Sequence, residues 1–341
     1  MRWEALYVSG VGACLPDRTS AEEAVRQGWY PAEDHADNEI AAVAVSESQA
    51  APVMAVDAAR QALSMCGHGP ADIAIVLYAS AYYQGQDLWT PASYVQREAL
   101  GGAAAAIAVD GASNGALAGL ELAGAYLSAG SGRMAALLST ADRYCAPGFD
   151  RWRSDSGVVF GDGASAVVLS RVDGFARVLA SNVTGGPELE EAARVTSGFA
   201  RAPLELGSPL DLAGRKSEFI KRFGYEGFMY RLADGVADNV ERTMTDAGTA
   251  MDGVRWVVLP NFGRTVLEWE FLDPLGVPIE RTLWDWGRHV GHLGPADQFA
   301  GVEHLLRSGA VEAGDRVLLV GIGVGFTWGS ALLEWKEKTG L

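Results

Sequence analysis

Short apolar runs rich in Val, Ile and Leu recur along the chain, and each is followed by small or polar residues. Runs of this length predict strands that are buried on both faces. The predicted strands are residues 73–78, 104–109, 134–139, 256–259 and 317–320. Ala-rich amphipathic stretches between them predict helices at residues 53–65, 115–128, 228–247 and 296–307. Because strands alternate with helices, we expect an α/β fold with largely parallel sheets.

The two halves of the chain end in a similar pattern. A strand at 317–320 leads through a glycine-rich turn at 321–325 into a further strand at 326–335. In the first half, residues 158–163 lead in the same way into a strand at 164–171. This similarity suggests two structural repeats.

One segment, residues 182–225, is the richest in Gly, Pro and charge, and we expect a linker and a cap over the active site there. It contains the densest basic group of the chain, which is Arg215, Lys216, Lys221 and Arg222. A second basic group is Arg143, Arg151 and Arg153. Each group can be a phosphate site or ordinary solvated surface charge.

The composition is that of a globular protein, because 341 residues with 49% hydrophobic residues can form about two domains or two fused halves. The formal net charge of −16 makes nucleic acid and anionic membrane surfaces poor partners. No segment offers the roughly 18 apolar residues of a membrane helix, and the N-terminus lacks a signal region, so we expect a cytoplasmic protein. Three distant cysteines without His at ligand spacing indicate neither disulfides nor a zinc site.

The strongest chemical signal is Ser113, which lies between a predicted strand and a predicted helix in the run Gly111-Ala112-Ser113-Asn114-Gly115. Small neighbours let a substrate approach, and free N–H groups at the helix N-terminus favour negative charge on a carbonyl oxygen. Ser113 is therefore a candidate nucleophile. Taken alone, the segment fits slightly better with a serine that only caps the helix.

A serine nucleophile needs a base, and the chain has only five histidines. His292 lies in a tight turn, and Asp297 follows five residues later at the start of a predicted helix. Asp297 can therefore fold back and orient the imidazole. A structural His and an Asp that serves the helix dipole are the alternatives.

The pattern Gly-x-Ser-x-Gly at 111–115 also fits the nucleophile turn of α/β-hydrolases. Chain order opposes this second hypothesis, because those enzymes run Ser, acid, His, whereas His292 precedes Asp297. His304 with Asp273 would restore the order, but His304 falls inside a predicted helix.

The chain resembles β-ketoacyl-ACP synthase III proteins of the thiolase superfamily over nearly its whole length. The resemblance rests on residues 8–12, 110–123, 160–164 and, above all, 325–332. It implies a thiolase-type, five-layered αβαβα sandwich of two repeated halves and a homodimer. The implied halves are residues 1–175, which carry the nucleophile, and 176–341, which carry His292, Asp297 and the glycine-rich turn.

Three positions depart from the family pattern. Ser113 stands where the family has its nucleophilic Cys, residues 259–262 replace its His-Gln-Ala-Asn motif, and His292 stands where it has a later Asn. Together these changes imply a Ser113–His292–Asp297 triad on a ketosynthase scaffold. The oxyanion hole would consist of the N–H groups of Ser113 and Val324.

Relatives with Ser resemble starter-unit proteins of aromatic polyketide pathways, such as anthracycline assembly of the daunorubicin or aklavinone type. We therefore expect a priming acyltransferase without a resident cofactor that moves a propionyl group from acyl-CoA to an acyl carrier protein and can also condense it with malonyl-ACP. The pantetheine arm would enter beside the 182–225 cap, where Arg215, Lys216, Lys221 or Arg222 would meet CoA or the carrier. The alternatives are an acyltransferase that modifies a sugar or amine and a non-catalytic subunit.

Overall fold

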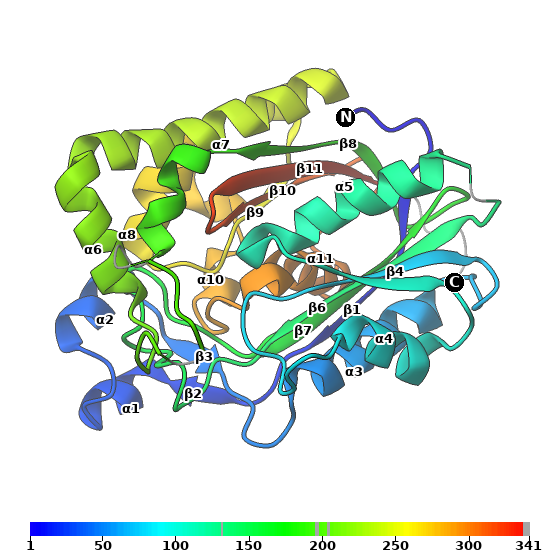
Figure 1. The fold of residues 1–341 in the computed structure, drawn as a ribbon. Coiled ribbons are helices and arrows are strands. Elements are labelled where there is room, and N and C mark those ends of the chain that lie inside the picture. Colours follow the sequence, from blue (N-terminus) through cyan, green and yellow to red (C-terminus); the bar gives the residue numbers. More distant parts are fainter. Residues whose placement is uncertain (131, 195–197, 203–204, 337–341) are drawn as a thin grey trace.

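The computed structural model describes residues 1–336 except 131, 195–197 and 203–204, and its largest feature is a nine-stranded sheet in the order β5-β4-β6-β7-β1-β8-β11-β10-β9 (Figure 1). The strands are β1 (Tyr7–Cys14), β2 (Arg18–Ser20), β3 (Ala42–Ala44), β4 (Ile73–Ala79), β5 (Ala105–Val109), β6 (Ala135–Asp142), β7 (Gly163–Ser170), β8 (Ala176–Gly185), β9 (Trp256–Val258), β10 (Arg316–Gly323) and β11 (Thr327–Trp335). Strands β2 and β3 form a separate pair.

The α-helices cover the sheet from several sides. They are α1 (Ala21–Arg26), α2 (Ala32–Asn38), α3 (Ala51–Met65), α4 (Pro91–Val95), α5 (Gly115–Ser128), α6 (Leu212–Phe223), α7 (Tyr225–Ala247), α8 (Arg264–Leu267), α9 (Asp273–Leu275), α10 (Trp284–Gly287) and α11 (Asp297–Ser308). Within the described residues, none of them has the length and apolar character needed to cross a lipid bilayer.

The sheet consists of two halves with the same internal order. Strands β1, β7, β6 and β4 follow one another outward from the centre, and β8, β11, β10 and β9 repeat that order on the other side. The halves meet where β1 pairs with β8 through Tyr7 and Val8. The predicted boundary between residues 175 and 176 stays a prediction, and β8 begins at Ala176.

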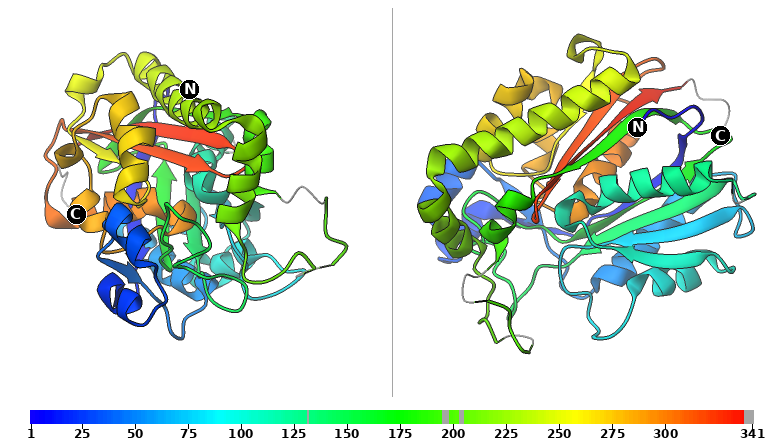
Figure 2. Two further views of the ribbon diagram at one scale, coloured as in Figure 1. Left: turned by 90° about the vertical axis from the view of Figure 1, so that its left-hand side faces the viewer. Right: turned by 45° about the horizontal axis from the view of Figure 1, so that its top comes forward.

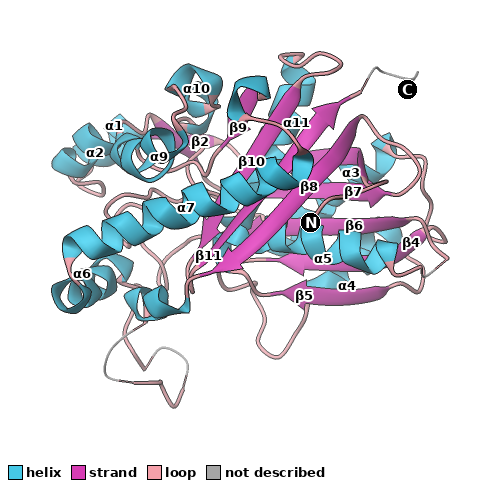
Figure 3. Ribbon diagram, turned by 90° about the horizontal axis from the view of Figure 1, so that it is seen from above, coloured by secondary structure: helices cyan, strands magenta, loops and turns pink. Residues whose placement is uncertain are grey.

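Five layers result from this arrangement (Figure 2). Helices α5 and α11 lie between the two halves of the sheet and contact both. Helices α3 and α4 cover the outer face of the N-terminal half, and α7 runs across the outer face of the C-terminal half (Figure 3). The predicted αβαβα sandwich is therefore confirmed, and the central layer brings the start of α5 next to the start of α11.

Close helix–strand contact explains two glycines in β1. A Cβ on Gly10 would lie 2.0 Å from the Ala62 carbonyl oxygen, and one on Gly12 would lie 2.3 Å from that of Ala58. Helix α3 can approach β1 this closely because the strand has no side chains at these positions and the helix has alanines.

The prediction of largely parallel sheets is wrong. Only the pairs β4–β5, β4–β6 and β9–β10 are parallel, and the other pairs of the large sheet are antiparallel. The apolar runs misled the interpretation because helices bury both faces of this sheet, so its antiparallel strands are as apolar as parallel ones.

Two further predictions need correction. Strand β5 is not buried, because it lies at the edge of the sheet and leaves Ile107 49% exposed. The predicted cap at 182–225 begins too early, because Asn182 to Gly185 belong to β8. Helix α6 lies within the remaining segment, of which residues 195–197 and 203–204 lie outside the described residues.

Candidate active site

Ser113 lies in the short turn between β5 and α5, at the N-terminal end of a 14-residue helix. The preceding Ala112 has φ of +46°, which is unusual for a residue with a side chain. Such a strained turn persists only where its surroundings hold it. The turn holds Ser113 half-buried at the wall of a cavity, close to the positive end of the α5 dipole.

The structure brings Ser113, His292 and Asp297 into one hydrogen-bonded chain. The Ser113 Oγ lies 2.8 Å from the His292 Nε2, and the His292 Nδ1 lies 2.6 Å from the Asp297 Oδ2. His292 and Asp297 are 2% and 1% exposed, so the contact between them is shielded from water. When Nδ1 donates its proton to Asp297, Nε2 is left as an acceptor for the serine hydroxyl.

Asp297, the first residue of α11, is held by three N–H groups in addition to His292. The backbone N–H and the side-chain amide of Asn261 donate to it at 2.9 and 3.0 Å, and the backbone N–H of Leu293 donates at 2.9 Å. The Asn261 amide also donates to the Gly291 carbonyl oxygen at 3.0 Å. Both carboxylate oxygens are therefore fixed, and Asp297 can act toward His292 only as an acceptor. Sequence reasoning assigned no role to Asn261, although it lies in the segment that replaces the family motif.

The backbone and ring of His292 are also held in place. Its N–H donates to the Val159 carbonyl oxygen, and its carbonyl oxygen accepts from the Gly161 N–H, both at 2.9 Å. Its ring packs against the Phe160 ring, with centroids 5.5 Å apart, and edge-on against the Phe262 ring at 4.9 Å. The predicted triad residues thus have a fixed geometry before any substrate binds.

The glycine-rich end of β10 packs against the nucleophile turn, and the turn predicted at 321–325 begins only after Gly323 because residues 321–323 still pair with β11. A Cβ on Gly323 would lie 2.4 Å from the Gly111 carbonyl oxygen and 2.9 Å from the Asn114 backbone nitrogen. Only glycine permits this approach. The next residue, Val324, lines the same cavity as Ser113, so both residues predicted for the oxyanion hole face one space.

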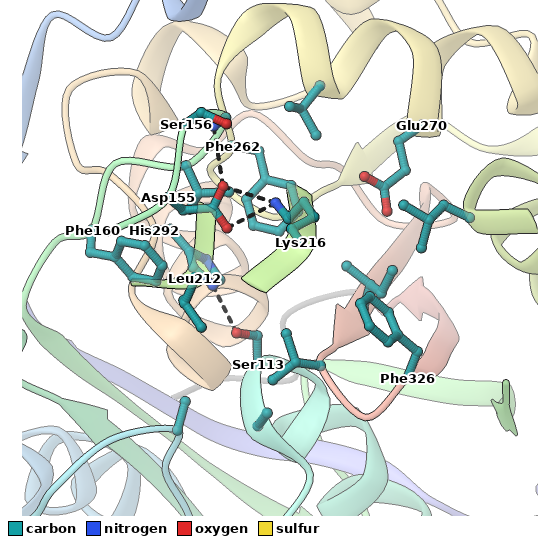
Figure 4. Close-up of a pocket in the computed structure, with 18 of the residues that line it drawn as sticks. Ser113, Asp155, Ser156, Phe160, Leu212, Lys216, Phe262, Glu270, His292 and Phe326 are labelled. Carbon is teal, nitrogen blue, oxygen red and sulfur yellow. Dashed lines mark hydrogen bonds and ion pairs between the residues drawn. The ribbon is translucent and has the colours of Figure 1, made fainter. Parts of the chain in front are cut away.

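That space is a cavity of about 350 Å³ at the junction of the two halves and the cap (Figure 4). Most of its wall is apolar, and aromatic rings form a large part of it. The aromatic lining residues are Tyr82, Tyr144, Phe149, Phe160, Tyr225, Phe228, Phe262, Trp269 and Phe326. A cavity of this kind suits an acyl group bound next to a nucleophile.

The four predicted basic residues do not gather at this cavity. Only Lys216 lines it, where its Nζ pairs with Asp155 at 2.8 and 2.9 Å. Arg222 pairs with Glu191, Arg215 donates to the Ala193 carbonyl oxygen, and Lys221 is exposed.

Two members of the second basic group, Arg151 and Arg153, support the fold. Arg151 forms an ion pair at 3.0 Å with buried Asp162, whose carboxylate also accepts from the backbone N–H groups of Ser46 and Tyr144. Arg153 donates to the carbonyl oxygens of Gly28 and Trp29. Arg151 is therefore neither a free phosphate ligand nor a solvated surface charge, the two interpretations that the sequence left open, but part of a buried ion pair.

Sequence reasoning missed two charged residues at the cavity, Asp155 beside Lys216 and, on a different element, Glu270. Glu270 lies in a π-helical turn, Glu268–Leu272, and is only 4% exposed. A charged residue beside Trp269 in an irregular helix gives no sequence signal of burial.

The hydrolase alternative is wrong. The His304 ring stacks on Trp286, with centroids 4.9 Å apart, and the histidine bonded to Ser113 is His292. The mixed sheet with its central helix layer is also not the sheet of an α/β-hydrolase.

Comparison with known proteins identifies the family. A family model described as 3-Oxoacyl-[acyl-carrier-protein (ACP)] synthase III matches residues 101–185, and the model of its C-terminal part matches residues 244–335. A β-ketoacyl-[acyl-carrier-protein] synthase III from Synechococcus sp. is 31% identical over 293 residues, which cover 84% of this chain and 82% of that protein. The chain belongs to this synthase III family. The enzyme of that name from Thermosynechococcus vestitus is 29% identical over 83% of each chain.

Solved structures agree with membership of the synthase III family. ChlB3, described as an acyltransferase, has a TM-score of 0.92 and 36% identity, with 97% of this chain and 98% of that chain covered. The synthase III of Pseudomonas aeruginosa PAO1 has a TM-score of 0.78 at 24% identity, with 98% and 99% covered, and supports the fold alone. The predicted thiolase-like fold and the predicted acyl-transferring enzyme are confirmed.

Proposed function

We propose that this protein is a priming acyltransferase that carries its acyl group on Ser113. It takes the group from coenzyme A and delivers it to an acyl carrier protein. The observation that supports this proposal is the continuous chain from the Ser113 hydroxyl through His292 to Asp297, at 2.8 and 2.6 Å. Serine needs such a base because its hydroxyl is a weak nucleophile.

In the first half-reaction the Ser113 Oγ attacks the thioester carbonyl carbon while its proton moves to the His292 Nε2. The tetrahedral intermediate collapses, the carbon–sulfur bond breaks, and His292 returns the proton to the departing CoA sulfur. In the second half-reaction the carrier thiol gives its proton to His292 and attacks the Ser113 ester. Collapse of that intermediate restores the serine hydroxyl with the same proton.

The two tetrahedral intermediates carry negative charge on the former carbonyl oxygen. We assign its stabilisation to the N–H groups of Ser113 and Val324, because both residues line the cavity. The N-terminal end of α5 adds a favourable dipole at the same place. The reaction needs no resident cofactor, since the thioester is the substrate and the phosphopantetheine belongs to the carrier.

We favour acyl transfer over condensation with malonyl-ACP. Residues 259–262 hold no histidine, and the Asn261 side chain is already bonded to Asp297 and Gly291. Neither a histidine nor a free Asn261 amide is therefore available in this segment to stabilise the enolate that forms when malonyl-ACP loses carbon dioxide.

The acyl group predicted from the sequence is propionyl, and aromatic polyketide assembly of the anthracycline type is the predicted pathway. The cavity accepts a three-carbon acyl group but is much larger than one, at about 350 Å³. We therefore propose propionyl as the smallest donor and expect larger acyl groups to bind as well.

Intact-protein mass spectrometry after mixing with propionyl-CoA tests the proposal. Wild type should gain one propionyl group, and S113A should gain none. S128A, at the other end of α5, is the matched control and should gain the group like wild type. No gain in wild type, or a gain that persists in S113A, would contradict the nucleophile and favour a non-catalytic subunit.

A second experiment separates the two acyltransferase alternatives. The acylated enzyme is mixed with a phosphopantetheinylated acyl carrier protein or with a deoxysugar. Discharge by the carrier alone supports priming. Discharge by the sugar alone supports an enzyme that modifies sugars.

A further inference from the structure

Away from Ser113 and His292, three charged side chains from three different segments lie in the largely apolar wall of the cavity. Asp155 comes from the loop before Phe160, Lys216 from cap helix α6, and Glu270 from the π-helical turn that follows α8. In Figure 4, Lys216 reaches toward Asp155. In the same view, Glu270 lies on the side of the cavity opposite Ser113. Polar groups that converge in an apolar pocket usually fix the orientation of a ligand.

Glu270 has no partner within the part of the chain that the structure describes. It is 4% exposed and lines the cavity, and no hydrogen bond joins its carboxyl group to another described residue. A buried carboxyl group without a partner is costly unless a ligand satisfies it. Burial raises the pKa of Glu270 to about 8, with Lys216 opposing and Asp155 adding to the rise, so the group is largely a neutral acid at pH 7. In that form it has one O–H donor and a carbonyl acceptor.

Lys216 does not make the cavity a site for anions. Its ammonium group is neutralised by Asp155 at 2.8 and 2.9 Å. A carboxylate or phosphate would therefore meet Asp155 and Glu270 as well as Lys216. The three side chains together suit a group that hydrogen-bonds without a charge.

We propose that Glu270, together with the Lys216–Asp155 pair, forms a recognition subsite for a neutral hydrogen-bonding group of the acyl thioester, such as a hydroxyl or an amide. This inference rests on the proposed function, because it names what the donor must carry. Two parts of the donor can supply such a group: a hydroxyl on the acyl chain or an amide of the pantetheine arm.

Binding of two thioesters tests the subsite without requiring the reaction. Propionyl-CoA and 3-hydroxypropionyl-CoA are titrated by calorimetry into S113A, which cannot be acylated at that position, and into S113A carrying E270L or E270Q. Loss of one neutral hydrogen bond should raise the Kd of the E270L protein about tenfold. E270Q should bind like its parent, because its amide also offers one acceptor and donors. M229L, a change of similar volume in the same wall, is the control.

The pattern of the loss identifies the source of the group. A loss confined to 3-hydroxypropionyl-CoA assigns the subsite to the acyl chain, and an equal loss with both thioesters assigns it to the pantetheine arm. Three results would each overturn the subsite. The E270L protein could bind both thioesters within twofold of its parent, or the E270Q protein could lose as much affinity as the E270L protein. The third result is an M229L protein that loses as much affinity as the E270L protein. If binding follows the prediction but Ser113 is never acylated, the subsite stands and the proposed chemistry is wrong.

Thermal unfolding distinguishes recognition from a structural role. Replacing a buried, unpaired carboxyl by leucine should leave the Tm unchanged or raise it. A marked fall in the Tm of E270L would indicate that Glu270 supports the fold, and would contradict the subsite.

Discussion

Asn261 donates both its backbone N–H and its side-chain amide to the two carboxylate oxygens of Asp297, at 2.9 and 3.0 Å. Because Asp297 in turn accepts from His292, Asn261 sets the orientation of the whole hydrogen-bonded chain without contacting the reacting atoms. It is therefore a positioning residue in the proposed mechanism.

N261A should lower the rate of Ser113 acylation by about 10²-fold, because small displacements of catalytic groups are costly. It removes the side-chain bonds to Asp297 and Gly291 and should also destabilise the fold by about 1–3 kcal/mol. Stopped-flow acylation at saturating propionyl-CoA checks the rate. An unchanged rate in a protein with a lowered Tm would show that Asn261 has only a structural role.

D297N should be more damaging than N261A. The amide nitrogen of an asparagine donates hydrogen bonds and cannot accept the Nδ1 proton of His292. The imidazole can then adopt the other tautomer, in which Nε2 carries the proton and cannot accept a hydrogen bond from Ser113. We expect acylation to slow by about 10³–10⁴-fold, with the cavity and donor affinity kept. Single-turnover rates and the Kd of propionyl-CoA measure the two effects separately. A loss of affinity with an unchanged rate would contradict the role given to Asp297.

The sequence predicted that Ser113, His292 and Asp297 lie together, but it did not predict the residues around them. The five-residue spacing of His292 and Asp297 in a turn before a helix can be recognised locally, whereas the link to Ser113 spans 179 residues and came from the family resemblance. Asn261 was missed because a lone Asn after a strand is typical of any loop. Its role depends on a contact with a helix 36 residues later.

Glu270 and the sheet show a different limit of sequence reasoning. The π-helical turn shifts the register of the helix, so a period of 3.6 residues cannot place Glu270 in the cavity. Strand β5 was predicted to be buried because its residues are apolar, but hydrophobicity does not distinguish an edge strand from a central one. In both cases the missing information is the position of neighbouring elements.

The unfolding free energy should depend on pH through Glu270. Its pKa rises from 4.5 to about 8 on folding, mainly by burial, with Lys216 and Asp155 as the charged groups that act on it. Between pH 4.5 and about 8 the folded chain holds a proton on Glu270 that the unfolded chain releases. The stability that this bound proton contributes is therefore complete below about pH 4.5 and is lost as the pH rises toward about 8. Guanidinium unfolding of wild type and E270L across this range checks the prediction. The stability advantage of E270L should grow with pH, and parallel profiles would contradict it.

The exposed edge of β5 makes a specific prediction about assembly. β5 ends the sheet and carries Ile107, which is 49% exposed, and nearby α5 exposes Leu122 and Tyr126 by 54% and 43%. An unpaired strand edge flanked by apolar side chains favours pairing with another strand. We propose that a second copy of the chain covers this edge and forms the predicted homodimer.

I107K should therefore convert the protein from the mass of two chains to that of one in light scattering after gel filtration. A lysine on an edge strand opposes pairing, because two copies related by a twofold axis would bring two such charges together. V172K is the control, since Val172 is 60% exposed in the loop after β7, outside the β5 edge and α5. A wild-type protein that elutes as a monomer would show that the chain forms no dimer. An I107K variant that stays dimeric would show that the dimer interface lies elsewhere.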